Sequence, residues 1–414
     1  LPHDLFSMSK TFTSCAVGFA RAEGLLDLED RVVDHLGDAG STDPNLHAMR
    51  LRHLLTMTTG HDGDVTGQTV TDPDWVHGFL SQPVQHPPGT HFVYNTAATY
   101  ALSAVVQART GQRLLDYLTP RLLEPLGVAG ATWEQSPQGI DTGGFGLALR
   151  TEDIACFGQL LLQDGVWQGR QVLPEGWVAE ASARQVRSVH SESDWTEGYG
   201  YQLWRSRHGY RADGAFGQFC LVLPEHQAVV VMTSATPDLQ GVLNRVWEHL
   251  VPHLDDPGPA PGDLAVLLPG PVPADPLAGA LAPGLLGRTF DLDPNPLGLT
   301  AMRLDAPDGG DGLEWTLWDR DGEGTIDVGP GRWVASTVGL RLGREGPVTG
   351  PVEVVGAAAL PDPGRLVLHV RPTVGPSRFE AQITWSDATV QMALGVNVAF
   401  GPTDLGTLTG HART

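Results

Sequence analysis

A stretch dense in proline and glycine, from Asp255 to Gly287, constrains the fold of this 414-residue chain more than any other feature. Its segments DDPGPAPGDL and LPGPVPADPLAG cannot continue a helix and are typical of a linker. Helical patterns dominate before it, and strand patterns dominate after it. We therefore predict a first domain over residues 1–255, a linker over residues 256–286 and a second domain over residues 287–414.

The first domain is predicted to be α/β (α+β), with short helices around a buried central one. Residues 6–23 are nearly all small or apolar, which suits a helix buried on most sides. The segment from Arg50 to Met57 predicts another helix. After Trp195, the segments YGYQLWR, GQFCLVLP and AVVVMTSA predict three antiparallel strands. The amphipathic segment 239–254 then predicts a helix that covers one face of the sheet.

The second domain is predicted to be all β. Five segments alternate or run β-branched between Gly and Pro turns, namely residues 313–318, 332–337, 365–370, 379–385 and 389–400. Short strands at regular spacing indicate a small antiparallel barrel or sandwich. No pair of nucleophile and base stands out there. We interpret this domain as a lid, a wall that shapes the substrate site or an oligomer contact, and the oligomeric state stays open.

Within the first domain, Ser7-Met8-Ser9-Lys10 places a hydroxyl three residues before an amine, at the start of an apolar helix. Residues i and i+3 share a helix face, so Ser7 and Lys10 are expected to touch. A lysine can take the proton of a serine only if burial or nearby cations lower its pKa. Lys10 is the only lysine, because the other 25 of the 26 Lys and Arg residues are arginine, which does not deprotonate in proteins. This contrast favours Ser7 as a nucleophile and Lys10 as its base.

The alternative for this pair is an ordinary helix N-cap followed by a solvated lysine. Tyr94 poses a similar choice, since a loop tyrosine ahead of a helix is usually a packed aromatic. Beside Ser7 and Lys10, its phenol becomes a candidate proton relay once a charged neighbour lowers its pKa. Asn95 and Thr96 offer an amide and a hydroxyl for Lys10 or a substrate carbonyl. The Gly pair in GIDTGGFGLAL suggests a close approach of the backbone near the site.

Composition narrows the range of partners. The formal net charge of −22 argues against nucleic acid or an anionic membrane surface as a partner. No apolar run is long enough to span a membrane, so we expect a soluble protein. His249 and His253 have the spacing of metal ligands, but Pro252 between them and the lack of a third ligand favour surface histidines. We predict no metal and no cofactor.

The cysteines form no spaced set. Their apolar contexts predict buried free thiols rather than a disulfide framework; they are Cys15, Cys156 and Cys220.

Three motifs in order make the first 255 residues or so resemble the serine β-lactamase-related family, which includes class C β-lactamases and related esterases, D-peptidases and penicillin-binding-protein-like hydrolases. Ser7 to Lys10 matches the S-x-x-K motif. Tyr94-Asn95-Thr96 occupies the Y-x-N position, and Ala212-Asp213-Gly214 occupies the K-T-G or H-x-G position. The segments LRHLLTMTTG, PPGTHFVYN and LEPLGV also resemble the family's connecting segments.

The resemblance implies a β-lactamase/transpeptidase-like fold, in which a mixed sheet with helices meets an all-α lobe at the site. It implies a serine hydrolase, in which an ester, amide or D-peptide carbonyl acylates Ser7 and the acyl-enzyme is then hydrolysed. Lys10 and Tyr94 would share the general base and acid roles, and the N–H groups of Ser7 and Ala215 would form the oxyanion hole. A small-molecule or peptide substrate would be held by residues of the second and third motifs: Asn95, Thr96, Ala212, Asp213 and Gly214.

The sequence departs from the family pattern at three points. Thr96 replaces the Asn of Y-x-N, and Ala212 replaces the Lys or His that would bind a carboxylate-bearing substrate such as a penicillin. Both changes favour a less charged ester, amide or peptide over true β-lactamase activity. The family's helix and strands before S-x-x-K are absent from a sequence that opens six residues before Ser7. With no signal peptide visible, this leaves open whether Leu1 is the natural N-terminus and whether the compartment is cytoplasmic or periplasmic.

Two other classes of function compete with this interpretation. A binding or scaffold protein with an impaired hydrolase site is the alternative, because the second and third motifs are altered. A Ser-His-Asp hydrolase of the doubly wound type is disfavoured, because the chain contains no G-x-S-x-G segment.

Overall fold

The computed structural model of the protein describes residues 2–188, 193–255, 284–307, 312–320, 322–339, 351–362 and 364–413. The chain divides into two compact units, Leu1–Gly258 and Pro259–Thr414. Most of the predicted linker, residues 256–283, lies outside the described residues, so the linker stays a prediction.

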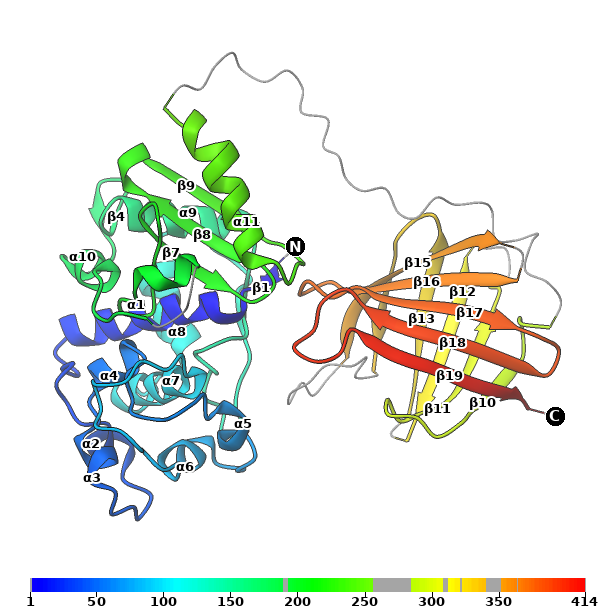
Figure 1. The fold of residues 1–414 in the computed structure, drawn as a ribbon, viewed down its shortest axis with the longest axis horizontal. Coiled ribbons are helices and arrows are strands. Elements are labelled where there is room, and N and C mark those ends of the chain that lie inside the picture. Colours follow the sequence, from blue (N-terminus) through cyan, green and yellow to red (C-terminus); the bar gives the residue numbers. More distant parts are fainter. Residues whose placement is uncertain are drawn as a thin grey trace. The chain divides into compact units, whose positions relative to one another are not determined.

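The first unit contains a helical lobe and a sheet with helices (Figure 1). Its longer helices are α1 (Ser9–Ala22), α7 (Thr96–Thr110) and α9 (Thr151–Leu162). The shorter α-helices are α2 (Val32–Leu36), α3 (Pro44–Ala48), α4 (Leu51–Leu55), α5 (Thr66–Thr69), α6 (Trp75–Leu80), α8 (Leu114–Leu118), α10 (Trp177–Ser182) and α11 (Leu239–Arg245). Single-turn 3₁₀ or π segments are η1 (Phe6–Met8), η2 (Thr119–Leu123), η3 (Asp194–Glu197), η4 (Pro224–His226), η5 (Val246–Leu250) and η6 (Val251–His253).

The described strands of the first unit form three sheets. The main sheet has the order β6 (Trp204–Arg205), β7 (Tyr210–Gly214), β8 (Gln218–Leu223) and β9 (Ala228–Met232). A smaller sheet has the order β1 (His3–Asp4), β3 (Leu147–Leu149) and β2 (Thr132–Trp133). The pair β4 (Val166–Trp167) and β5 (Arg170–Gln171) forms a hairpin.

Helix α1 runs between the helical lobe and the main sheet (Figure 1). Every residue from Ser9 to Ala20 is buried, as expected for a central helix of small and apolar residues. Phe12 of α1 stacks on Phe157 of α9, with ring centroids 4.1 Å apart. This helix therefore holds the start of the chain in the middle of the unit.

The main sheet is covered on both faces, and strand β8 shows how. Cys220 and Val222 belong to the core cluster that contains α1 and α9. The alternating residues Phe219, Leu221 and Leu223 pack instead with residues of α11 and η5. Because side chains alternate along a strand, these two sets of residues lie on opposite faces of the sheet. One face is covered by α11, η5 and η6, so the predicted covering helix at 239–254 is confirmed.

Two details of the sheet differ from the prediction. Residues 199–203 are mostly irregular, and the predicted first strand is reduced to β6, while β7 is an additional strand. The resemblance implied a mixed sheet, but each pairing described in this unit is antiparallel. Helix prediction was closer, since residues 6–23 form η1 and α1, and α4 covers the core of residues 50–57.

The second unit is a closed β-barrel with its own apolar core. Its strands are β10 (Thr289–Leu292), β11 (Leu299–Asp305), β12 (Leu313–Asp319), β13 (Glu323–Pro330), β14 (Val334–Val338), β15 (Val352–Asp362), β16 (Arg365–Pro372), β17 (Phe379–Trp385), β18 (Thr389–Val396) and β19 (Asp404–Ala412). Neighbouring strands pair antiparallel, and a short parallel pairing of β13 with β15 closes the barrel. Of the predicted barrel or sandwich, the barrel is therefore confirmed.

Other sequence predictions can be placed in this fold. The three cysteines are free thiols; Cys15 and Cys220 are buried, and Cys156 is half-buried. His249 and His253 are exposed, as predicted. Among the described residues, no group of three or more His, Cys, Asp or Glu could hold a metal ion. In the same part of the chain, no helix is both long and apolar enough to cross a membrane.

Candidate active site

Ser7 and Lys10 meet at the start of the central helix, as their spacing predicts. Ser7 lies in η1, and Lys10 follows in the first turn of α1. The Nζ of Lys10 donates a hydrogen bond of 2.9 Å to Ser7 Oγ and another of 2.8 Å to the carbonyl oxygen of Gly144. The amine therefore has one fixed contact with the candidate nucleophile and one with a loop from elsewhere in the unit.

The amine of Lys10 is poised to lose its proton. Lys10 is 1% exposed. Burial lowers the pKa of Lys10 to about 7, although the charges of Asp64 and Asp213 raise it. Desolvation disfavours the charged form of a lysine, so a neutral amine is well populated near pH 7. The predicted depression of this pKa by burial is confirmed, and the alternative of a solvated lysine is wrong.

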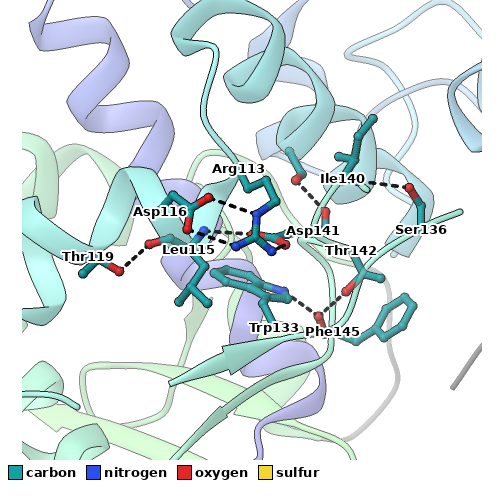
Figure 2. Close-up of polar contacts among 11 residues, drawn as sticks. Arg113, Leu115, Asp116, Thr119, Trp133, Ser136, Ile140, Asp141, Thr142 and Phe145 are labelled. Carbon is teal, nitrogen blue, oxygen red and sulfur yellow. Dashed lines mark hydrogen bonds and ion pairs between the residues drawn. The ribbon is translucent and has the colours of Figure 1, made fainter. Parts of the chain in front are cut away.

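The loop that carries Gly144 is held by polar contacts around Asp141 (Figure 2). The buried Asp141 accepts a hydrogen bond of 2.9 Å from the backbone N–H of Leu115 and pairs with Arg113 at 3.5 Å. Burial raises the pKa of Asp141 to about 6. Further along, Trp133 Nε1 and Thr142 Oγ1 both donate to the carbonyl oxygen of Phe145. The carbonyl that Lys10 contacts thus belongs to a fixed loop.

The two glycines of this loop leave no room for a side chain. A Cβ on Gly143, whose φ is +66°, would lie 2.9 Å from both Ser103 Cβ and the Thr99 carbonyl oxygen. A Cβ on Gly144 would lie 2.7 Å from Thr96 Cγ2. The predicted close backbone approach at the Gly pair is therefore confirmed, and it is what brings the Gly144 carbonyl to Lys10.

Tyr94 lies beside this pair, in the loop before α7. Lys10 Nζ is 4.9 Å from the centroid of the Tyr94 ring, and the ring stacks on Trp204 with centroids 5.4 Å apart. Burial and the charge of Asp213 raise the pKa of Tyr94, while hydrogen bonds with Ser7 and Trp204 act against this rise. The prediction that its neighbours lower this pKa is wrong, because burial outweighs them. Tyr94 remains a protonated phenol in contact with Ser7.

The third motif lies on β7, and its acidic residue is not free. Asp213 accepts a hydrogen bond of 2.9 Å from Arg211 Nε, and both residues are buried. Burial raises the pKa of Asp213, whereas Arg211 lowers it. Ala212, which separates these two residues in the sequence, is also buried. A Cβ on Gly214 would lie 2.1 Å from the Leu5 carbonyl oxygen, so this strand lies directly against the turn that carries Ser7.

The two predicted oxyanion donors are flanked by strained backbone. Phe6, just before Ser7, has a φ of +47°, and Phe216, just after Ala215, has a φ of +62°. Their rings pack edge to face at 5.3 Å. Gln218 Nε2 fixes the loop through a bond of 3.0 Å to the Ala215 carbonyl oxygen. Among the hydrogen bonds of the described residues, the Ala215 N–H has no acceptor, so it is free to act as a donor. Non-glycine residues with positive φ cluster at functional sites.

Asn95 and Thr96 have contacts within the protein. Asn95 is fully buried, with its Oδ1 3.4 Å from the Val65 N–H and its Nδ2 3.3 Å from His61 Nδ1. Thr96 begins α7 and packs against Gly144. In this structure both residues position the loops around Tyr94, and their predicted contact with substrate stays a prediction.

Sequence reasoning missed two contributors to the site, Trp204 and Asp64, and it did not predict that the Gly144 carbonyl accepts a hydrogen bond from Lys10. Trp204 and Asp64 act on Tyr94 or Lys10 from segments distant in the sequence, and Gly144 contributes only its carbonyl. The Gly143–Gly144 pair indicated in the sequence that the backbone approaches the site closely. Neither Trp204 nor Asp64 belongs to a recognisable motif, so only the packing of the folded chain identifies them.

A helical lobe, a sheet with helices on both faces, and a serine and a lysine at the start of the helix between them define a β-lactamase/transpeptidase-like fold. The chain belongs to the Beta-lactamase family, whose model matches residues 1–250. This membership confirms the serine β-lactamase-related family that the motifs indicate.

Individual relatives agree with this assignment. The chain is 26% identical over 263 residues to a 6-aminohexanoate-dimer hydrolase of Paenarthrobacter ureafaciens, covering 57% of this chain and 67% of that protein. It is also 26% identical over 141 residues to Protein flp of Staphylococcus aureus, but spans 28% of its length. Family and relatives together support hydrolase chemistry.

Solved structures show the same fold. A structure from Bacillus anthracis, titled as a 6-aminohexanoate-dimer hydrolase, is 22% identical with a TM-score of 0.51, covering 59% of this chain and 71% of its own. An octameric penicillin-binding protein homologue from Pyrococcus abyssi is 15% identical with a TM-score of 0.50. This second match covers 99% of this chain and 88% of its own, so it extends over both units.

Proposed function

We propose that the protein is a serine hydrolase that forms an acyl-enzyme on Ser7 from an ester, amide or D-peptide substrate. The observation that carries this proposal is the buried Lys10 amine, 2.9 Å from Ser7 Oγ, with a pKa of about 7. A serine becomes an effective nucleophile when an adjacent base takes its proton.

The geometry supports a two-step reaction. Ser7 Oγ attacks the substrate carbonyl carbon, and its proton passes to the neutral amine of Lys10. The N–H groups of Ser7 and Ala215 hold the resulting oxyanion. Tyr94, which keeps its phenolic proton, donates it to the leaving group and recovers a proton from Lys10. A water molecule then attacks the acyl-enzyme by the same proton path in reverse, which releases the acid and restores Ser7.

Two features favour weak or no β-lactamase turnover. Ala212 supplies no cation at the third motif, and the neighbouring Arg211 is already paired with Asp213. A penicillin carboxylate would therefore lack the charge-assisted partner that makes such contacts strong. The names of two relatives, each called a 6-aminohexanoate-dimer hydrolase, agree with an amide substrate.

The test compares hydrolysis of p-nitrophenyl butyrate and of nitrocefin by the purified protein and by Ser7→Ala. We expect ester hydrolysis that Ser7→Ala abolishes, with nitrocefin cleaved weakly or not at all. Ser14→Ala is the matched control, because Ser14 lies on the same helix and its buried hydroxyl has no hydrogen-bond partner among the described residues. If wild type and Ser7→Ala hydrolyse neither compound, the scaffold alternative replaces the enzyme.

A further inference from the structure

Asp64 lies in the loop that precedes α5 (Thr66–Thr69), and this loop contacts the residue after Tyr94. It is exposed, and its Oδ1 accepts hydrogen bonds of 2.9 and 2.5 Å from the backbone and side chain of Thr66. Within the described ranges, it takes part in no ion pair. By contrast, Asp62 in the same loop pairs with His86 at 2.6 Å. The charge of Asp64 is therefore available to a bound molecule.

Contacts of the neighbouring residues fix this loop beside Tyr94. The backbone N–H of Val65 donates to Asn95 Oδ1, and Asn95 directly follows Tyr94 in the chain. Asn95 also contacts His61 of the same loop. Asp64 is thus one residue away from a hydrogen bond to the residue after Tyr94, and its charge raises the pKa of both Lys10 and Tyr94.

His61 anchors the start of this loop inside the protein. It is 1% exposed, and burial lowers its pKa to about 4, so its ring is neutral near pH 7. Its Nδ1 contacts Thr59 Oγ1 and Asn95 Nδ2, which can both donate to it. Its buried Nε2 has no hydrogen-bond partner among the described residues. The contact with Asn95 ties this end of the loop to the residue that directly follows Tyr94.

The charged groups that act on Lys10 and Tyr94 are carboxylates. Those that shift the pKa values of Lys10 and Tyr94 come from Asp64 and Asp213. Asp213 is neutralised by Arg211, and Lys10 is itself about half neutral near pH 7. The carboxylate of Asp64, which has no ion-pair partner among the described residues, therefore attracts cations and repels anions.

We propose that Asp64 binds a cationic group of the substrate, so that the enzyme prefers esters or amides bearing an ammonium group to carboxylate-bearing ones. This inference rests on the proposed serine hydrolase function and adds the substrate class to it. The full chain can be tested with three 4-nitrobenzyl esters, those of β-alanine, N-acetyl-β-alanine and N-succinyl-β-alanine. They place an ammonium, a neutral or an anionic group on the same acyl chain.

The measured quantity is the ratio of kcat/KM for the ammonium ester to kcat/KM for the neutral ester, at pH 7 and low salt. A ratio cancels the effect of Asp64 on the pKa of Lys10, because both substrates meet the same enzyme. Each kcat/KM is first divided by that ester's rate of hydrolysis by hydroxide. We then expect a wild-type ratio above one, and Asp64→Asn should lower it about two- to fivefold, the size of an exposed charge pair. High salt should lower the wild-type ratio as well, because salt screens the charge of Asp64.

Asp62→Asn is the matched control, since Asp62 lies in the same loop but is paired with His86. It should keep the wild-type ratio. If Asp64→Asn keeps that ratio too, or if wild type prefers the succinyl ester, the assignment of Asp64 is wrong, while neutral-ester hydrolysis that depends on Ser7 leaves the proposed function standing. Loss of all ester hydrolysis in wild type overturns both.

Discussion

Lys10 makes the site sensitive to pH at the scale of a single residue. Its pKa falls from an ordinary value of 10.5 to about 7 on burial, so the unfolded state binds more protons than the folded state between these values. Stability should therefore rise as pH increases from about 7 to about 10, and the cost of the buried cation is complete below pH 7. Lys10→Met should lose this slope in urea unfolding measured across that window. An unchanged slope would mean that Lys10 titrates like a solvated amine.

The same proton should control the rate. Because only the neutral amine can accept the Ser7 proton, kcat/KM for a neutral ester should increase as pH rises through about 7 and then level off. The check is a pH profile with p-nitrophenyl butyrate, corrected for spontaneous hydrolysis. A profile that is flat from pH 6 to 9 would contradict the role of Lys10 as base.

Tyr94 permits a second residue-scale prediction. Tyr94→Phe keeps the ring that stacks on Trp204, so the fold should remain intact. Loss of the phenol should lower turnover about a hundredfold or more, the usual size of a general acid or base contribution. Stopped-flow kinetics would assign the loss to acylation, deacylation or both. Turnover at the wild-type rate would return Tyr94 to the role of a packed aromatic.

At the scale of elements, the loop that bears Gly144 aligns the lysine. In Gly144→Ala, the new methyl group would meet Thr96 at the start of α7 and displace the carbonyl that Lys10 contacts. We expect a loss of about 1–3 kcal/mol in stability, together with lower esterase activity. Gly67→Ala in α5 is the control, because its Cβ would meet nothing within 4 Å. Equal behaviour of the two variants in thermal unfolding and ester hydrolysis would refute this role of the loop.

Some helices, strands and contacts of the fold were predictable from the sequence, and others were not. Helix α1, the contact of Ser7 with Lys10 and the Gly pair follow from local spacing and composition, so they were predictable. The five segments predicted in the second domain leave out strands β10, β11, β13, β15 and β19. In the last three, Gly, Ala and Asp have low strand propensity, and pairing in the barrel decides the conformation. Trp204 and Asp64 act through tertiary packing, which leaves no local signal.

At the scale of the whole molecule, each unit has a core of its own. The clusters of buried residues that include α1 and the main sheet lie within the first unit, and the barrel cluster lies within the second. We therefore predict that residues 1–255 alone fold cooperatively and hydrolyse p-nitrophenyl butyrate. Circular dichroism melting and ester kinetics of this fragment, beside the full chain, provide the check. A folded but inactive fragment would assign the barrel a part in catalysis.

The central claim is that Lys10 activates Ser7 for covalent catalysis, and the rate of Ser7 labelling by a fluorophosphonate measures this most directly. Intact mass and peptide mapping of the full chain should show one adduct, located on Ser7, that forms faster as pH rises through about 7. Lys10→Arg keeps the positive charge, but arginine does not lose its proton and cannot act as a base. Labelling should therefore slow about a thousandfold or more, and Ser7→Ala should not be labelled. Labelling of Lys10→Arg at the wild-type rate, or an adduct on another residue, would contradict the claim.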